Sequence, residues 1–226
     1  RERMARQALR RGEGSAGVNA AMQAFSPDAL TIGFARRFAT YKRAPLIFQD
    51  LERLKSILND PRRPVQLVFA GKAHPRDVPG QEYAQRIHEL CKEDGLRGKV
   101  ALIEEYDMEV GRMLTAGSDV WLNNPLRPYE ASGTSGMKPP MHGGINCSIL
   151  DGWWPESFDG RNGWAIGDTQ PMQDREAQDR KDSQSLYSII EGEMRREFYD
   201  RDGSGLPQRW IDRALQSAAT VPPMFN

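Results

Sequence analysis

The sequence predicts an α/β fold, a doubly wound parallel sheet with helices on both faces. Short apolar runs of strand length alternate with stretches in which apolar residues recur at helical spacing, as expected for such a sheet. In addition, the glycine-rich and basic motifs of the chain each follow one of these apolar runs. Ligands of parallel sheets bind beyond the carboxyl ends of the strands, so we expect the motifs to converge on one edge.

Five apolar runs predict the strands, and the stretches between and after them predict helices. The predicted strands are 30–34, 65–70, 100–103, 120–122 and 146–150. The predicted helices are 44–58, 81–93, 107–116, 183–196 and 206–218, with a basic helical stretch at 1–11 that is broken by glycines at 12–17. Pro45 suits a first helical turn, and Asp107 suits a helix start. The polar stretch 170–184 predicts a solvated loop.

Composition limits the classes of function. The 31 basic and 31 acidic residues give zero formal net charge, which argues against nucleic acid or an anionic membrane as partner. Cys91 and Cys147 do not form a disulfide framework, so a reduced, cytoplasmic protein is expected. No apolar run approaches the ~20 residues of a membrane span, and the charged first residues of the chain lead us to expect no signal peptide. Three histidines without clustered acids or cysteines predict no metal site.

The most informative segment is Glu130-Ala-Ser-Gly-Thr-Ser-Gly-Met-Lys138. Its glycines let the backbone approach a ligand, and Ser132, Thr134 and Ser135 suit the cap of a following helix. N–H groups at a helix N-terminus hold phosphate, and Lys138 is expected just inside that helix. A lysine beside a phosphate cradle is what pyridoxal phosphate requires. The alternative is a capped helix start with a solvated lysine.

A basic cluster follows the first predicted strand. Arg36, Arg37, Lys42 and Arg43 place four cations within eight residues, ahead of a predicted helix. Cations in this position add to the field of the helix on a bound anion. The alternative is a solvated basic face.

Several motifs, in their order along the chain, resemble the α-glucan phosphorylases, the glycogen and maltodextrin phosphorylase family. The nine-residue segment resembles that family's pyridoxal-phosphate lysine segment, and the basic cluster resembles its phosphate-binding segment. The other motifs are Gly71-Lys72-Ala73-His74-Pro75, Glu104-Glu105-Tyr106, Leu150-Asp151-Gly152-Trp153-Trp154 and Gly160-Arg161-Asn162-Gly163-Trp164-Ala165-Ile166-Gly167. The resemblance runs from about Thr31 to Asn226 and is to the shorter, non-mammalian branch.

The resemblance implies roles for single residues. Arg37 and Lys42 are expected to contact the substrate phosphate, where together with Lys138 they form the catalytic set. Glu130 is expected to bind sugar hydroxyls, with backbone contacts from Ser132 and Gly133. The residues expected to hold the cofactor, with Lys138 as its Schiff base, are Arg36, Tyr106, Thr134, Ser135, Gly136 and Lys138.

Other residues keep two interpretations. Trp153, Trp154 and Trp164 suit either sugar stacking or core packing. His74 and His142 suit packed or surface positions, with at most a supporting role for His142. Pro139 and Pro140 depart from many relatives, and they delay or distort the expected helix.

The resemblance also implies the overall function. Residues 29–226 are expected to form the Rossmann-like, cofactor-binding domain of a two-domain glycosyltransferase, preceded by a basic helical arm and linker at 1–28. The whole enzyme is expected to transfer terminal α-1,4-linked glucosyl units to inorganic phosphate, giving glucose 1-phosphate. The 5′-phosphate of pyridoxal phosphate would act as acid–base catalyst.

The expected partners are the glucan, phosphate, glucose 1-phosphate and an N-terminal domain absent from this chain, with self-association as a further expectation. Without that domain the chain is expected to fold but to be inactive. The alternatives are a nucleotide-sugar-dependent glucan synthase and a non-catalytic ligand- or partner-binding module.

Overall fold

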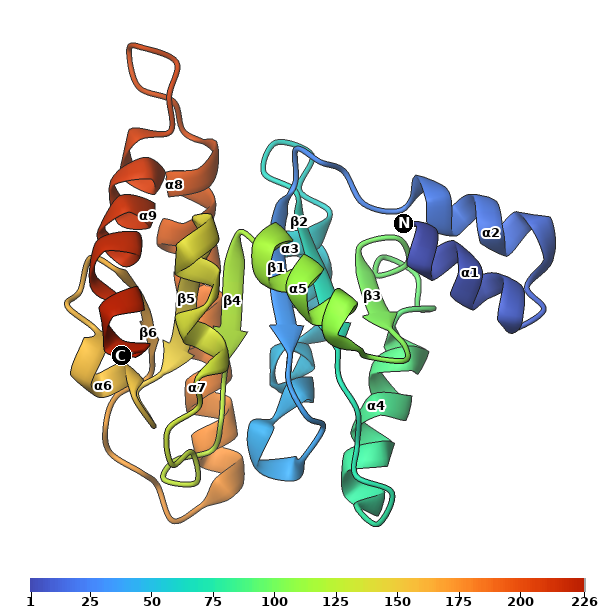
Figure 1. Ribbon diagram of the computed structural model, residues 1–226, viewed down its shortest axis with the longest axis horizontal. Coiled ribbons are helices and arrows are strands. Elements are labelled where there is room, and N and C mark those ends of the chain that lie inside the picture. The colour runs from blue at the N-terminus through green and yellow to red at the C-terminus, as the bar shows by residue number, and fades with distance from the viewer. Residues whose placement is uncertain (226) are drawn as a thin grey trace.

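Six parallel strands form one sheet in the order β3-β2-β1-β4-β5-β6 (Figure 1). The structure is a computed structural model that describes residues 1–225. The strands are β1 (Leu30–Ala35), β2 (Val65–Ala70), β3 (Val100–Ile103), β4 (Val120–Asn123), β5 (Ile145–Ile149) and β6 (Gly163–Ile166). The five predicted strands are confirmed with ends within one residue, whereas β6 was not predicted. This order is that of a Rossmann-like sheet, and the strand order reverses between β1 and β4.

Strands β1 and β4 meet over a short length only. β1 pairs with β2 along all of its residues, but it pairs with β4 only at Ile32–Val120 and Gly33–Trp121. Gly33 permits this approach, because a Cβ there would lie 2.1 Å from Ser118 Oγ. The loops after β1 and β4 therefore leave the sheet on either side of the point where the strand order reverses, which is where ligands bind in such folds.

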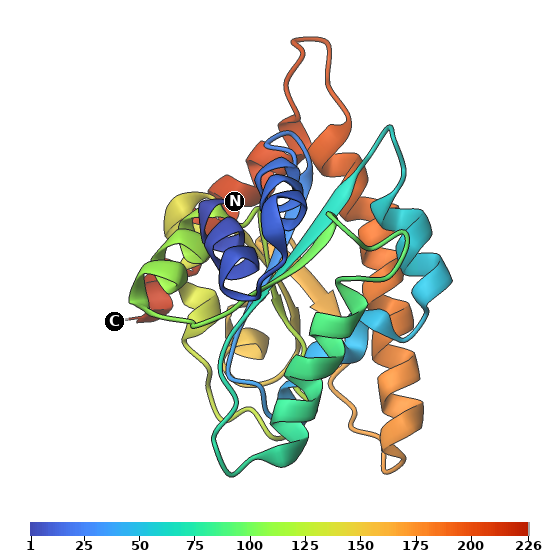
Figure 2. The same ribbon diagram turned by 90° about the vertical axis from the view of Figure 1, so that its right-hand side faces the viewer.

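Helices cover both faces of the sheet (Figure 2). One face packs on α3 (Leu51–Leu58), α4 (Val78–Leu90) and α7 (Arg175–Ile189), which bury the main apolar core. The opposite face packs on α5 (Met108–Gly117). The remaining helices are α1 (Glu2–Arg10), α2 (Gly14–Gln23), α6 (Trp154–Ser157), α8 (Arg195–Tyr199) and α9 (Gln208–Thr220). None of the helices in the described part of the chain combines the length and the apolar character that a membrane crossing needs.

Helix α1 lies beside the edge strand β3. The side-chain amide of Gln7 donates to the carbonyl of Leu102 (2.9 Å) and accepts from the N–H of Glu104 (3.0 Å), so it satisfies backbone groups that an edge strand would leave unpaired. Arg3 pairs with Asp107 at 2.7 Å, which fastens the helix to the loop after β3. At least one basic side chain of this segment thus pairs with an acidic residue of the same chain.

Two local predictions are wrong, and a third holds only in part. Residues 170–184 were expected to form a loop, but α7 begins at Arg175, where the Asp174 carboxylate accepts from the N–H of Glu176 (2.9 Å). The buried face of α7 includes polar side chains such as Asp182, so the helix has little apolar periodicity to detect. Residues 44–58 form a 3-10 turn and then α3, because Asp50 starts a new helix by capping Arg53. The expected break after the first helix is confirmed at Gly12, but the break is short, because Gly14 and Gly17 already lie in α2.

Candidate functional site

A cavity of about 650 Å3 lies at the carboxyl ends of β1 to β4. The residues that line it are Ala35, Arg36, Arg37, Tyr41, Lys42, Gly71, Lys72, Ala73, His74, Pro75, Tyr106, Glu130, Gly133, Thr134 and Ser135. They come from the four loops that follow these strands. The expected convergence of the motifs on one edge of the sheet is therefore confirmed.

Two cations share one carboxylate in this cavity. The Arg36 guanidinium donates to Glu130 Oε2 at 2.9 Å, and the Lys42 amine donates to the same oxygen. The three side chains are 7–10% exposed. Burial lowers the pKa of Arg36, while the neighbouring Glu130 carboxylate opposes this change. The group nevertheless stays cationic, since arginine starts far above neutral pH.

The wall carries an excess of positive charge. Arg37 and Lys72 are exposed on it, and neither forms an ion pair with another described residue. The Lys42 amine also lies 4.6 Å from the centre of the Tyr41 ring. The cavity is thus lined by four cations and one carboxylate, Glu130, so it attracts anions.

Glycines shape the turn between Glu130 and Gly136. Gly133 has φ +79°, and a Cβ there would lie 3.0 Å from Glu130 Oε1 and 3.2 Å from Arg36 Nη2. A Cβ at Gly136 would lie 2.7 Å from side-chain atoms of both Asn123 and Asn146. Only glycine leaves room here, so the turn packs directly against the cation pair on one side and the sheet on the other.

The expected helix at Lys138 is wrong. Residues 135–142 form two short 3-10 turns, Ser135–Met137 and Pro139–His142. Pro139 and Pro140 have no N–H to donate to the carbonyls four residues earlier, so the α-helical hydrogen bonds are interrupted. No long helix therefore presents its N-terminus to the cavity from this segment. The segment therefore offers an anion only its side chains and the turn.

The structure brings most of the expected site residues together, with three exceptions. Arg36, Arg37, Lys42, Tyr106, Glu130, Gly133, Thr134 and Ser135 line the cavity. Ser132 and Lys138 are exposed and Gly136 is buried behind the turn, and none of the three is in the lining. Tyr41, Lys72 and His74 also line it, although the sequence predicted no role for them. The position of 71–75 directly after a strand was the signal that marked two of them.

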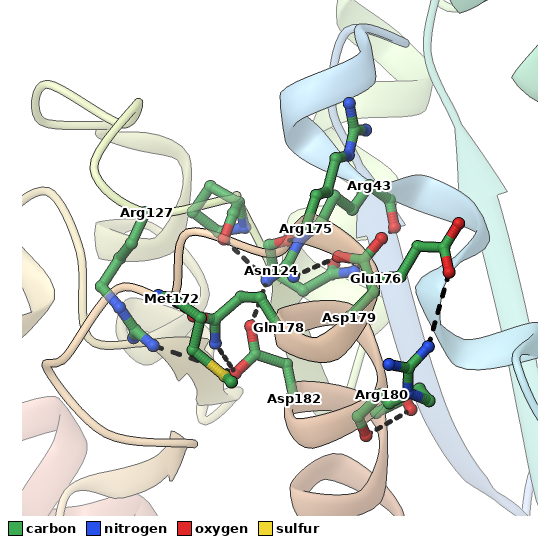
Figure 3. Close-up of polar contacts among 12 residues, drawn as sticks. Arg43, Asn124, Arg127, Met172, Arg175, Glu176, Gln178, Asp179, Arg180 and Asp182 are labelled. Atoms are coloured by element: carbon green, nitrogen blue, oxygen red, sulfur yellow. Dashed lines mark hydrogen bonds and ion pairs between the residues drawn. The ribbon is translucent and has the colours of Figure 1, made fainter.

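Arg43, the fourth cation of the basic cluster, does not line the cavity. Its side chain is buried and points toward α7 (Figure 3). The interpretation of four cations acting on one anion is therefore wrong for this residue, because its charge is already paired with carboxylates of that helix.

The three tryptophans are packing residues in this structure. Trp153 and Trp154 are buried in a cluster with Met137 and Val221. Trp164 is buried in the main core. Their rings are covered by protein and do not line the cavity, so of the two interpretations core packing holds.

Comparison with known proteins places this chain in a family. The sequence profile of the family described as carbohydrate phosphorylase matches residues 18–156. The glycogen phosphorylase of Aquifex aeolicus is 48% identical over 88% of this chain and 28% of its own length. The maltodextrin phosphorylase of Thermococcus litoralis is 46% identical over 93% of this chain and 25% of its own length. The chain thus spans about a quarter of the length of these relatives.

Solved structures support the fold alone, because their sequence identity is 16%. Anabaena HepE in complex with UDP matches 96% of this chain and 47% of its own chain, with a TM-score of 0.60. The C-terminal domain of the group 1 glycosyltransferase LpcC from Francisella tularensis matches 87% of this chain and 86% of its own, with a TM-score of 0.57.

Proposed function

The chain belongs to the carbohydrate phosphorylase family, and we propose that it is the phosphate- and cofactor-binding part of an α-glucan phosphorylase. In this proposal the whole enzyme transfers a terminal α-1,4-linked glucosyl unit to inorganic phosphate and forms glucose 1-phosphate. The observation that carries the proposal is the cavity that Arg36, Arg37 and Lys42 line, in which Arg36 and Lys42 share the Glu130 carboxylate.

The cations of the cavity bind the inorganic phosphate. Arg37 is exposed on the wall and presents a planar fork that matches phosphate oxygens, and Lys42 adds a point charge deeper in the site. Two phosphate groups held close together repel, and nearby fixed cations offset that repulsion without solvent reorganisation. Glu130 accepts hydrogen bonds from sugar hydroxyls, and Gly133 lets the turn approach the sugar.

The residues beside the cations fit the phosphate end of pyridoxal phosphate. The Ser135 hydroxyl is buried and has no hydrogen-bond partner among the described residues, and it lines the cavity next to Thr134. Arg36, Thr134, Ser135 and Tyr106 would hold the cofactor, and the exposed Lys138 amine would bind its aldehyde carbon. When bound, the cofactor supplies a phosphate whose proton is exchanged with the substrate phosphate.

Reductive trapping tests this proposal. The chain is incubated with pyridoxal phosphate, reduced with borohydride and mapped by peptide mass spectrometry. We expect the adduct on Lys138, equal labelling of the matched variant Lys181→Ala, whose exposed amine pairs with Asp168 outside the cavity, and loss of the adduct in Lys138→Ala. Labelling spread over other lysines, or unchanged labelling of Lys138→Ala, would contradict the proposal and favour a nucleotide-sugar-dependent transferase.

The chain alone is proposed to lack phosphorylase turnover. It spans about a quarter of the length of its relatives, and the rest of such an enzyme would position the glucan and exclude water. Positioning of this kind is worth about 7–11 kcal/mol of the barrier. We expect no release of glucose 1-phosphate from maltodextrin when cofactor and phosphate are saturating. Turnover near that of a full-length relative would show that one domain suffices.

A further inference from the structure

The side chain of Arg43 forms hydrogen bonds both to the loop after β4 and to α7 (Figure 3). Nε donates to the carbonyl of Asn124 and Nη2 to that of Pro125, both at 2.9 Å. Nη1 donates to Asp179 at 2.7 Å, and Nη2 donates to Asp182 at 2.8 Å. These bonds use four of the five N–H groups of a guanidinium. The side chain is 2% exposed, so a ligand in the cavity cannot reach the remaining N–H group.

The backbone at Arg43 takes part in the same arrangement. Its φ of 50° and ψ of 43° are left-handed, a conformation that a non-glycine residue keeps where its surroundings fix it. The Asn124 side-chain amide donates to the carbonyl of Arg43 at 2.8 Å. The N–H of Leu126 donates to the carbonyl of Tyr41 at 2.6 Å. The loop after β1 is thus joined to the loop after β4 through main chain and side chain together.

These two loops carry the two sides of the cavity. Lys42 directly precedes Arg43, and Glu130 follows Asn124 in the second loop. The amine of Lys42 meets the carboxylate of Glu130 across the gap between β1 and β4. The position of this flexible amine depends on the path of its backbone, which the contacts of Arg43 determine.

The acidic side of this arrangement is balanced in charge. Asp182 is 1% exposed, accepts from Gln178 at 2.9 Å and lies 3.8 Å from the guanidinium of Arg127. Together with Asp179 and Arg43, two carboxylates face two guanidinium groups. Because these charges offset each other, this cluster adds little field to the cavity, and its effect there is geometric.

We propose that Arg43 is a positioning residue that fixes the Lys42 amine for phosphate binding by holding the two site loops against α7. This inference rests on the proposed function of the cavity as a phosphate site. It predicts that Arg43→Lys weakens phosphate binding although it keeps the charge, because one ammonium group cannot form the four divergent hydrogen bonds of the guanidinium.

Calorimetric titration of the chain with inorganic phosphate tests the inference, at a temperature where each variant is folded by circular dichroism. We expect Arg43→Lys to weaken phosphate binding by about tenfold or more, as when a charged hydrogen bond to the anion is lost. The matched control is Arg53→Lys, because Arg53 pairs with Glu191 at 2.6 Å from α3 and does not line the cavity. It should bind phosphate as the unaltered chain does.

Amide hydrogen exchange is the second measurement, and it reports on position directly. In Arg43→Lys the peptides covering 36–43 and 124–130 should exchange faster, while those of β2 should not change. Should Arg43→Lys not fold, Asp179→Asn removes a single contact and should give a smaller change of the same kind. Labelling of Lys138 by pyridoxal phosphate should persist in both variants.

Each remaining outcome overturns a defined statement. If Arg43→Lys binds phosphate like the unaltered chain while Arg37→Ala loses binding, the positioning role is wrong and the proposed function stands. An equal loss in Arg43→Lys and Arg53→Lys would reduce the effect to general destabilisation and would also refute the role. If Arg37→Ala and the unaltered chain bind equally, or neither binds, the proposed phosphate site fails and the inference fails with it.

Discussion

Lys42 and Arg43 are neighbours in the chain, yet they belong to two different ion-pair clusters. In the cavity, Arg36 and Lys42 share one oxygen of Glu130, beside a space of about 650 Å3. Behind it, Arg43 donates to two carboxylates and two carbonyls, and it is buried against α7. The comparison teaches that a cation is available for function when the fold leaves its charge and its donors incompletely matched.

The physical basis of this difference is desolvation. Charges removed from water are stable only where nearby partners replace the lost hydration, so a broken buried pair is strongly destabilising. In the cluster behind the cavity, Asp182 is buried away from water. The cavity cluster opens to solvent, so water or an anion can replace a partner there. The two clusters should therefore respond differently to the loss of a carboxylate and to added phosphate.

The largest expected effect is on the cluster behind the cavity. Asp182→Ala leaves Arg43 and Arg127 buried with less negative charge, and we expect the free energy of unfolding to fall by about 3–5 kcal/mol. Urea unfolding followed by fluorescence measures this. The control is Asp168→Ala, which removes the exposed ion-pair partner of Lys181, a residue of α7 like Asp182. The free energy of unfolding should change little in this control. If phosphate restored the stability of Asp182→Ala, the two clusters would not differ in their response to anions.

A smaller effect is expected in the cavity. Glu130→Gln removes the carboxylate shared by Arg36 and Lys42, and the free energy of unfolding should fall by about 1–3 kcal/mol. The loss is smaller than for Asp182→Ala because solvent in the cavity reaches these cations. Phosphate should bind the freed cations and restore stability, by about 2.7 kcal/mol at 100 times its dissociation constant. Thermal unfolding at increasing phosphate, with sulfate as a second anion, measures the recovery. A variant that gains no more from phosphate than the unaltered chain would place the anion elsewhere.

The smallest effect concerns the turn that faces the cation pair. Gly133→Ala and Gly143→Ala both force a side chain onto a left-handed glycine, with φ of +79° and +83°. Each should lose about 1–2 kcal/mol for the backbone alone. A Cβ at Gly133 also lies within 3.2 Å of Glu130 and Arg36, whereas a Cβ at Gly143 meets nothing within 4 Å. Only Gly133→Ala should weaken phosphate binding by calorimetry. Equal binding by both variants would separate the turn from the site.

The sequence by itself determined five strands of the sheet and the place of the site. The apolar runs at 30–34, 65–70 and 100–103 are local signals, since a buried parallel strand needs an apolar residue at nearly every position. The convergence of the motifs followed from that assignment, because the carboxyl ends of parallel strands lie at one edge of the sheet. The resemblance of these motifs to the phosphorylases agreed with the family that the comparisons show.

The tertiary structure alone decided what each charged side chain does. The basic cluster has four similar cations in sequence, and only the left-handed turn at Arg43 and the distant helix α7 send the last of them away from the cavity. The polar residues of α7 were read as solvated because a buried charge is recognised only through its partners, which are remote in the chain. The tryptophans and Lys138 follow the same rule: local sequence set their chemistry, and packing set their exposure.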